Sequence, residues 1–249
     1  MTTRVFLAHP SYGQTEPESG FAERCASLRD DVEVHCASFR KSMTCHNFND
    51  HLRECMQRGG YQYWCLLHAD VAPAEGFVDA MLDSLESRDL DVTHAPCRYK
   101  NDSGKVMTAL GRPGKFWGPN REITTSELAQ LPHTFDADDV CELFDMPDRI
   151  LLPNTGCMMF RLDSWIEDFP GFRMIDQFGR DSLSGDWVAR SVSEDYWFGF
   201  WAAENGVRVG GTKHPTGHWG RREFRSDEIC GQEHDEGFLR VAQLEGAAV

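Results

Sequence analysis

Residues 61–77 (YQYWCLLHADVAPAEGF) constrain the fold of this chain more than any other segment. Tyr63–Leu67 is an apolar run of strand length, which predicts a buried strand. The run continues directly into His68-Ala69-Asp70 and then into a turn marked by Pro73. Open α/β sheets form their ligand sites outside the carboxyl ends of the strands, where the sheet cannot satisfy a carboxylate. Asp70 therefore needs solvent, a partner side chain or a metal ion.

Length and composition favour one α/β domain that spans residues 1–249, because no linker divides the chain. Hydrophobic residues make up 41% and aromatic residues 11%, which supports a buried core and excludes global disorder. The first apolar run is too short for a signal peptide, and no segment has membrane-spanning length. Nine cysteines without a CxxC motif indicate reduced thiols. We expect a cytoplasmic protein without a membrane partner.

The formal net charge of −15 disfavours non-specific binding to nucleic acid or anionic lipid. The charge is unevenly distributed: residues 98–121 contain six Lys and Arg and one Asp, whereas residues 122–148 contain acids and no Lys or Arg. Such a basic segment is either solvated surface or a face for a polyanion. Residues 98–148 are also rich in Gly and Pro, so we expect a long acceptor loop or mobile lid.

Local patterns alternate between strands and helices. Strands are expected at residues 4–9, 32–37, 63–67, 91–96 and 207–210, with a turn that leads into a short strand within 151–161. Helices are expected at residues 20–28, 47–57, 77–85, 194–205 and 238–244. This alternation predicts an α/β sandwich with a largely parallel sheet.

Asp70 admits two interpretations. It can cap the next helix or lie in an ordinary turn. It can also be an oxygen ligand for Mg²⁺ or Mn²⁺, ions that proteins hold with few carboxylates together with ligand phosphates. His68 lies two residues earlier, on the same side of an extended chain, where it would add a ligand or line the pocket. The HAD tripeptide alone does not decide between these alternatives.

Residues 191–199 (SVSEDYWFG) place two acids at the start of the helix expected at 194–205. Ser191 and Glu194 have the spacing of a capping box, and acids in a first turn interact favourably with the helix dipole. Asp195 is not needed for that cap. An ionised aspartate at a helix N-terminus can accept the proton of a hydroxyl group, so Asp195 is a candidate general base.

Residues 212–220 (TKHPTGHWG) contain His214 and His218, and Pro215 and Gly217 predict a loop there. A zinc site would need a third ligand that the neighbouring sequence does not supply. His218 therefore gains significance only if it lies close to Asp70 in space.

In their order along the chain, these segments resemble the GT-A class of nucleotide-sugar-dependent glycosyltransferases. The resemblance extends from residue 5 to residue 220. It is carried by VFLAHPSYG (5–13), the helix with Asn47 and Asn49, HAD (68–70), NTGCMMFR (154–161), SEDYWFG (193–199) and HWG (218–220). It implies a three-layer α/β/α sandwich with a mostly parallel sheet, and transfer of a sugar from a UDP-sugar to an acceptor hydroxyl group.

The resemblance also implies roles for individual residues. Asp70 would occupy the last position of the DxD motif and, with His218, hold a divalent cation, Mn²⁺ or Mg²⁺. Asp195, with Glu194 beside it, would be the catalytic base of an inverting reaction; a retaining reaction stays open if Asp195 does not face the anomeric carbon. The implied donor-binding residues are Pro10, Ser11 and Tyr12 around the uracil or ribose, together with Asn47, His68, Asn154 and Gly156. His68 stands where the motif has its first aspartate, which leaves the identity of the metal open.

The acceptor is less determined. The chain resembles short phage enzymes of this class, including those encoded beside TET-like oxygenases that glycosylate 5-hydroxymethylcytosine in DNA; such an enzyme would act in the host cytoplasm. The DNA-compatible features are the basic segment with Lys115 and Trp117, and Arg221 after the HWG motif. The net charge opposes DNA, and a saccharide, a protein or a small molecule is the alternative acceptor.

Two further functions stay open. A nucleotidyltransferase would need a Gly-rich, basic phosphate loop near the N-terminus, which HPSYG (9–13) does not supply. A non-catalytic nucleotide-sugar-binding module would keep the same pocket without turnover.

Overall fold

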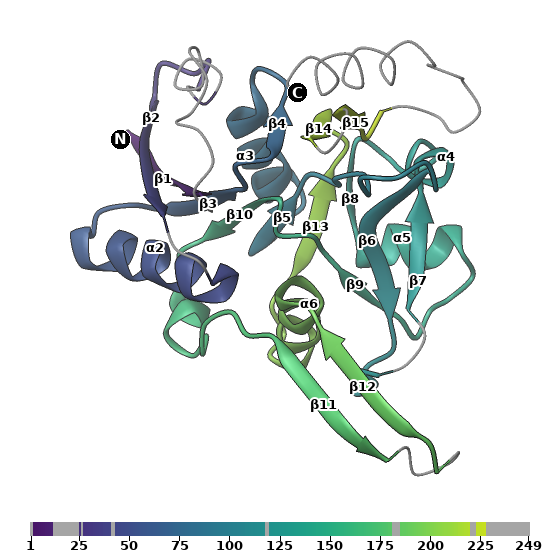
Figure 1. The fold of residues 1–249 in the computed structure, drawn as a ribbon. Coiled ribbons are helices and arrows are strands. Elements are labelled where there is room, and N and C mark those ends of the chain that lie inside the picture. The colour runs from purple at the N-terminus through teal and green to yellow at the C-terminus, as the bar shows by residue number, and fades with distance from the viewer. Residues whose placement is uncertain are drawn as a thin grey trace, which may run out of the picture.

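The computed structural model describes residues 2–11, 25, 27–40, 43–117, 120–180, 185–219 and 223–227. Its centre is a seven-stranded sheet with the strand order β2-β1-β3-β10-β5-β13-β8 (Figure 1). The strands are β1 (Thr3–Ser11), β2 (Val32–Arg40), β3 (Tyr63–Leu67), β5 (Val92–His94), β8 (Thr134–Asp136), β10 (Cys157–Arg161) and β13 (Val209–Thr212). The strand predicted at residues 63–67 is confirmed with the same bounds.

The central sheet is mixed. β1 pairs in parallel with β2 and β3, and β5 pairs in parallel with β13. β10 runs antiparallel to both β3 and β5, and β8 runs antiparallel to β13. The α/β class is confirmed, but the expected mostly parallel sheet is corrected to a mixed one. β10 runs in reverse because it enters the sheet from a turn after β9 (Ile150–Leu152), without the crossover that parallel neighbours require.

Helices pack on both faces of this sheet. Alternate residues of β3 enter two separate cores: Trp64 and Leu66 lie in one, and Cys65 and Leu67 lie in the other. α2 (Thr44–Arg58) and α6 (Glu194–Glu204) contribute to the first core, and α3 (Phe77–Ser87) contributes to the second. The helices predicted at residues 47–57, 77–85 and 194–205 are thus confirmed, with ends that differ by at most a few residues.

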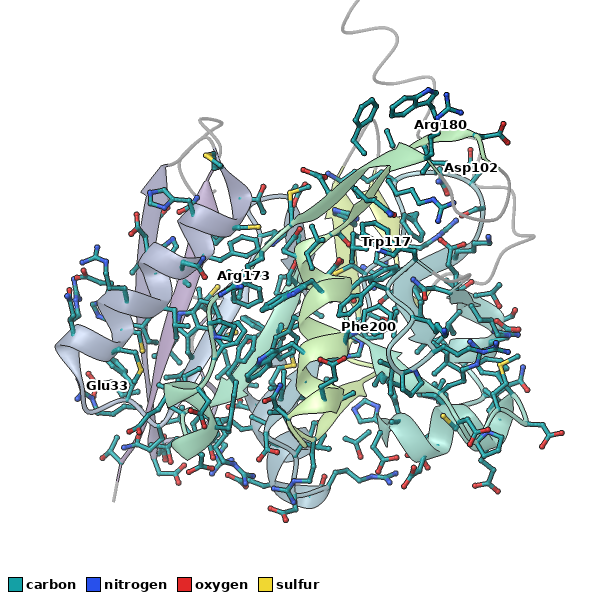
Figure 2. The ribbon with its side chains drawn as sticks, turned by 90° about the horizontal axis from the view of Figure 1, so that it is seen from below. Glu33, Asp102, Trp117, Arg173, Arg180 and Phe200 are labelled. Atoms are coloured by element: carbon teal, nitrogen blue, oxygen red, sulfur yellow. The ribbon has the colours of Figure 1, made fainter. Side chains whose placement is uncertain are left out.

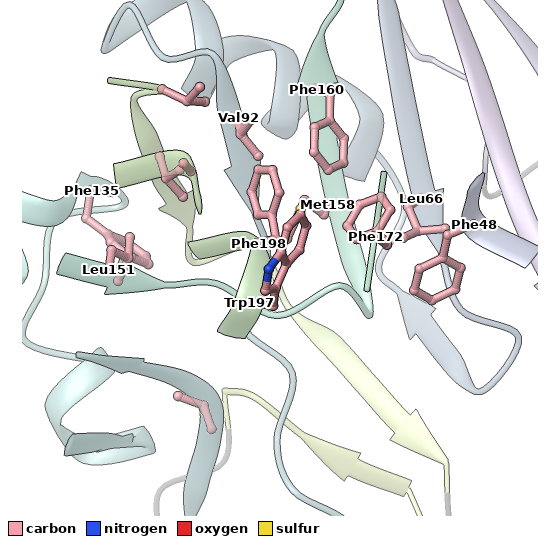
Figure 3. Packing of buried hydrophobic residues seen from close by; sticks show 14 of the residues in the cluster. Phe48, Leu66, Val92, Phe135, Leu151, Met158, Phe160, Phe172, Trp197 and Phe198 are labelled. Carbon is pink, nitrogen blue, oxygen red and sulfur yellow. The ribbon is translucent and has the colours of Figure 1, made fainter. Parts of the chain in front are cut away.

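An aromatic cluster around Phe172 forms the centre of the larger core (Figure 3). The rings whose centroids lie within 6.0 Å of the Phe172 ring are those of Phe48, Trp64, Phe160, Phe169 and Phe198. Asn49 of α2 also holds the backbone here, because its Nδ2 donates to the Phe172 carbonyl at 3.1 Å and its Oδ1 accepts from the Phe172 N–H at 2.7 Å. The segment after the short helix η1 (Ser164–Glu167) is thereby attached to α2.

Residues 98–148 are not the long loop that their composition predicts. β6 (Lys105–Gly111) pairs antiparallel with β7 (Arg121–Thr124) and with β9, which gives a three-stranded sheet. α4 (Thr125–Leu128), β8 and α5 (Ala137–Leu143) follow. Capping boxes begin both helices, formed by Thr124 with Glu127 and by Asp136 with Asp139. These local bonds satisfy the first backbone N–H groups and explain why an acidic, polar segment is helical.

Two smaller sheets complete the described structure. One contains β4 (Val71–Pro73), β14 (Thr216–Trp219) and β15 (Glu223–Arg225), so the loop expected around Pro215 and Gly217 includes a strand. The other is a ribbon of β11 (Ile175–Arg180) and β12 (Trp187–Val192) that projects from the body (Figure 1). The helix expected at 20–28 lies largely outside the described residues, and the one at 238–244 lies entirely outside them. In the described part of the chain, no helix has the length and apolar character needed to cross a membrane.

Phe172→Ala is expected to lower the free energy of unfolding by about 3–5 kcal/mol, because it removes a buried ring from the aromatic cluster and leaves a cavity. Phe178→Ala is the matched control: Phe178 is 80% exposed, so its loss should change stability by less than about 0.5 kcal/mol. Urea unfolding followed by circular dichroism measures both variants. Equal losses would contradict the assignment of Phe172 to the core.

Candidate functional site

The carboxyl ends of β1 and β3 meet at one edge of the central sheet. The two strands pair in parallel, with Ala8 opposite Leu66, so the last residues of β1 lie beside the residues that follow β3. Pro10 is buried near the end of β1. Tyr12 and the side chain of Ser11 lie outside the described part of the chain, so the contacts predicted between these residues and the nucleoside stay predictions.

The antiparallel pairing of β14 with β4 brings His218 to Asp70. Val71 directly follows Asp70, and His218 lies opposite Val71 in the register. The Nε2 atom of His218 consequently lies 3.6 Å from Oδ2 of Asp70. The two residues that the sequence nominated as metal ligands, although far apart along the chain, are neighbours in the structure.

A backbone carbonyl fixes the orientation of the His218 ring. Nδ1 lies 2.7 Å from the carbonyl oxygen of Arg98, so Nδ1 carries a proton and donates it to that oxygen. Nε2 then faces the Asp70 carboxylate. That contact is favourable if Nε2 also carries a proton or if a cation lies between the two groups. A carbonyl bonded to the other ring nitrogen is also the usual second partner of a metal-bound histidine.

Lys100 supplies a positive charge at the same place. Its ammonium group forms an ion pair with Oδ2 of Asp70. Burial disfavours the ionised carboxyl group, but the contacts from His218 and Lys100 outweigh it and hold the pKa of Asp70 well below its usual value. Among the described residues, no group of three His, Cys, Asp or Glu side chains could hold a metal ion. Asp70 and His218 would therefore hold a cation together with oxygen atoms of a bound ligand.

His68 lies between α2 and the Asp70 turn. Its ring centroid is 4.9 Å from that of Phe48, and burial lowers the pKa of His68 to about 4, which keeps the ring neutral at physiological pH. Its Nε2 atom is buried without a hydrogen-bond partner in the described structure. This atom is free to bond a polar group of a ligand, and the donor-binding role of His68 stays a prediction.

Asn154 and Gly156 hold the Asp70 turn against the end of β5. Asn154 is fully buried: its Oδ1 accepts from the Cys97 N–H at 3.2 Å, and its Nδ2 donates to the Ala95 carbonyl at 3.3 Å. A Cβ atom on Gly156 would lie 3.0 Å from Cys97 Sγ, so this close approach requires glycine. Both residues support the site structurally, and their direct contact with a sugar stays a prediction.

Thr155, between Asn154 and Gly156, lies where the segment that carries Asp70 meets the segment that carries Glu194 and Asp195. Thr155 Oγ1 donates to Oε1 of Glu194 at 3.2 Å, and the carbonyl of Gly156 accepts from the His68 N–H at 2.9 Å. The start of α6 is thus tied to the turn that carries Asp70. The structure brings together the HAD, NTG and SED segments.

Ser193 is the N-cap residue of α6, and the capping box expected between Ser191 and Glu194 is not formed. Ser191 lies one residue before the end of β12, so it is too early to cap the helix. The Ser193 hydroxyl donates to Oδ1 of Asp195, which also accepts the backbone N–H of Tyr196 at 2.7 Å. These two bonds orient the Asp195 carboxyl group.

Asp195 is only 5% exposed, and burial together with the charge of Glu194 raises its pKa to about 7. The expectation of a fully ionised aspartate is therefore corrected, because a substantial fraction of Asp195 is protonated at neutral pH. A carboxyl group with a pKa near the working pH is well suited to accept a proton from a hydroxyl group.

A cavity of about 380 Å³ lies beside the start of α6. It is lined by Phe116, Trp117, Asn120, Met174, Arg190, Ser191, Val192, Ser193 and Tyr196. Of the three predicted acceptor-binding residues, Trp117 lines this cavity (Figure 2), Lys115 is exposed two residues earlier, and Arg221 lies outside the described residues. Asn47, a predicted donor-binding residue, is fully buried in α2.

Sequence reasoning missed Lys100, Thr155 and Tyr196. Lys100 is one of several cations in a basic segment, and its pairing with Asp70 depends on tertiary structure. The Tyr196 hydroxyl lies 3.4 Å from that of Tyr99, and Tyr196 also lines the cavity. Its position directly after Asp195 is the one signal in the sequence that could have identified it.

No model of a known protein family matches the chain, and no curated protein matches it either. The functional proposal below therefore rests on the side chains at this edge of the sheet and on the resemblance of the motifs.

We expect the Asp195 carboxyl group to titrate near pH 7. Its pKa is higher in the folded than in the unfolded chain, so the folded state binds more protons between about pH 4 and pH 7. This group therefore stabilises the fold less as the pH rises through that range. Asp195→Asn should gain stability relative to the unmodified chain when the pH is raised from 5 to 8.

Urea unfolding at both pH values tests this expectation, with Asp83→Asn, at an exposed position of α3, as the control. A ¹³C NMR titration of the carboxyl group reports the pKa directly. If Asp195→Asn has the same pH dependence of stability as the unmodified chain, the raised pKa of Asp195 is wrong.

Proposed function

We propose that this protein is a metal-dependent glycosyltransferase that moves a sugar from a UDP-sugar to an acceptor hydroxyl group with inversion of configuration. The observation that carries the proposal is the pair of Asp70 and His218, whose Nδ1 is bonded to a carbonyl and whose Nε2 faces the carboxylate at 3.6 Å. A buried carboxyl group with a pKa of about 7, that of Asp195, lies on a helix tied to the same turn.

The fold supports this proposal. The α/β architecture, with helices on both faces of a mixed sheet, is compatible with the GT-A-like three-layer sandwich that the motifs resemble. The proposed donor site lies where open α/β sheets place their ligands, outside the carboxyl ends of β1 and β3. Pro10 and Ser11 are the last two residues of β1 and Tyr12 is next in the sequence, and we assign all three to the nucleoside of the donor.

The donor atoms present fit a divalent cation held jointly by the protein and the substrate. Asp70 would provide one oxygen and His218 one nitrogen, and the diphosphate of the donor would complete the coordination. When bound, the cation would neutralise the charge that develops on the leaving diphosphate. Lys100 now pairs with Asp70, so cation binding would release its ammonium group. Lys100 would then be available to bind a phosphate oxygen.

Asp195 would act on the acceptor. Its carboxylate accepts the proton of the acceptor hydroxyl, the hydroxyl oxygen bonds to the anomeric carbon, and the bond from that carbon to the UDP oxygen breaks with its electron pair on UDP. Ser193 and the Tyr196 N–H hold the carboxylate in place for this transfer. Burial, together with the negative charge of Glu194, keeps the pKa of Asp195 high.

For the acceptor we propose 5-hydroxymethylcytosine in DNA. The cavity beside Ser193 and Tyr196 has aromatic walls from Phe116 and Trp117, which suit a base turned out of its stack. Lys115 is exposed and directly precedes Phe116 in the chain, and we assign it as a cation for a phosphate group. A saccharide, a protein or a small molecule is the alternative acceptor, and a binding module without turnover is the alternative function.

Asp70→Ala is expected to abolish metal-dependent turnover. The unmodified protein with Mn²⁺ should slowly hydrolyse at least one UDP-sugar, and EDTA should stop the reaction, because the cation would be needed for the departure of UDP. Release of UDP measures the rate, and calorimetry with Mn²⁺ and UDP measures binding. Asp83→Asn is the matched control, since that carboxylate lies on the exposed side of α3.

Hydrolysis that persists in EDTA and in Asp70→Ala would contradict the metal role. Binding of UDP without turnover of any nucleotide sugar would instead favour the binding module.

Asp195→Asn is expected to bind UDP and Mn²⁺ with unchanged affinity and to transfer sugar about 10²–10⁴-fold more slowly, because the amide cannot accept the hydroxyl proton. Mass spectrometry of hydroxymethylated DNA after incubation with a panel of UDP-sugars measures transfer. A normal rate in this variant would refute the role of Asp195 as the base. Donor hydrolysis without a mass gain on DNA would refute the DNA acceptor alone.

A further inference from the structure

The β11–β12 ribbon carries two large aromatic side chains in solvent. Phe178 is 80% exposed and Trp187 is 62% exposed. Their ring centroids lie 5.3 Å apart at an interplanar angle of 22°, so the rings are stacked on each other. Exposed apolar surface of this kind on a protein usually marks a binding site.

The strand register explains why these rings meet. Arg180 pairs with Trp187 and Phe178 pairs with Ala189, so all four side chains lie on one face of the ribbon, with the two rings on a diagonal. The guanidinium group of Arg180 lies 5.0 Å from the centroid of the Trp187 ring. Figure 2 shows Arg180 near the outer end of the ribbon, away from Arg173 at its base. The outer face thus presents a stacked pair of rings with a cation beside the Trp187 ring.

The base of the ribbon lies at the proposed acceptor cavity. Arg190, Ser191 and Val192 of β12 line that cavity, and the next residue, Ser193, caps α6. Only two residues separate the end of β12 from Asp195. The ribbon therefore leads to the cavity beside the start of the helix that carries the proposed base.

The local charge differs from that of the chain as a whole. Residues 173–192 contain three Arg and three Asp, so the ribbon is neutral in a chain whose net charge is −15, and residues 112–117 add Arg112 and Lys115 without an acid. The ribbon therefore does not repel a polyanion, and the two cations of the neighbouring segment, whose Phe116 and Trp117 line the same cavity as β12, favour its approach.

We propose that the β11–β12 ribbon is the element that docks acceptor DNA, by entering the major groove next to the modified cytosine. The inference rests on the proposed function. A two-stranded β-ribbon fits the major groove of B-DNA. The hydroxymethyl group is attached to C5 of the base, the position at which thymine displays its methyl group in that groove. The ribbon thus enters the groove that displays the acceptor hydroxyl.

The aromatic pair favours a nucleic acid over a protein surface. Bases stack on aromatic side chains irrespective of sequence, and a neighbouring arginine strengthens that contact. Phe178 and Trp187 would stack on bases that open when the target cytosine leaves the duplex, while Trp117 lines the cavity that receives it.

The test is a Phe178→Ser/Trp187→Ser double variant. We expect its affinity for a hydroxymethylated duplex to fall about tenfold or more at fixed salt, with an equal loss of DNA glycosylation at low DNA concentration. UDP-sugar hydrolysis should not change, because in the described structure Asp70 is paired with Lys100 and His218 with the Arg98 carbonyl, none of which belongs to the ribbon. Leu28→Ser is the matched control, since Leu28 is an exposed apolar residue (67% exposed) elsewhere on the surface. Arg180→Gln should reduce the salt dependence of binding by about one phosphate contact.

The possible outcomes are distinguishable. DNA affinity that is unchanged in the double variant, or absent in the unmodified protein, would overturn the docking role. A dimer in ultracentrifugation that the double variant loses would identify the ribbon as a contact between copies and would also overturn it. If the protein hydrolyses no UDP-sugar but binds DNA through the two rings, the docking role stands and the glycosyltransferase proposal fails.

Discussion

The short antiparallel pairing between β4 and β14 is the contact on which the candidate site depends. It joins the residues just after β3 to the segment after β13, and it places His218 opposite the neighbour of Asp70. Further bonds lock it in place: the Ala74 N–H donates to the Pro215 carbonyl at 3.0 Å, and Thr216 Oγ1 donates to the Pro96 carbonyl at 2.9 Å. Without this pairing, Asp70 would be an exposed carboxylate at the end of a strand with Lys100 as its partner.

Part of this structure could be predicted from the sequence. Tyr63–Leu67 was predicted with its observed bounds because a strand buried on both faces is apolar without interruption. The direction of β10 could not be predicted, because it depends on which strands flank it in the sheet rather than on its own residues. The Gly, Pro and charged residues of 98–148 predict a loop, although the capping-box pattern of Thr124 and Glu127 is present in the same segment.

The candidate site, like the fold, could be predicted from the sequence only in part. The resemblance of the motifs nominated Asp70 and His218, and the register of β14 explains why they meet. The resemblance of the motifs could not identify Lys100, because only tertiary contacts distinguish this lysine from the other cations of its segment. The protonation of Asp195 was also beyond prediction: a helix N-terminus favours the ionised form, whereas burial beside Glu194, visible only in the fold, opposes it more strongly.

The charge states of Asp70 and Asp195 are compatible with a site that binds a charged substrate. The carboxylate of Asp70 is balanced by Lys100, and Asp195, with a pKa of about 7, is protonated in part at neutral pH. A diphosphate and a divalent cation would arrive as a nearly neutral pair, so Lys100 could transfer from the carboxylate to a phosphate oxygen while the cation takes its place at Asp70. The local charge would then change little on donor binding, which limits the electrostatic cost of burying the donor at this edge. Asp195 would lose its proton as the pH rises through about 7, so its capacity to accept the proton of an acceptor hydroxyl group would increase through that range.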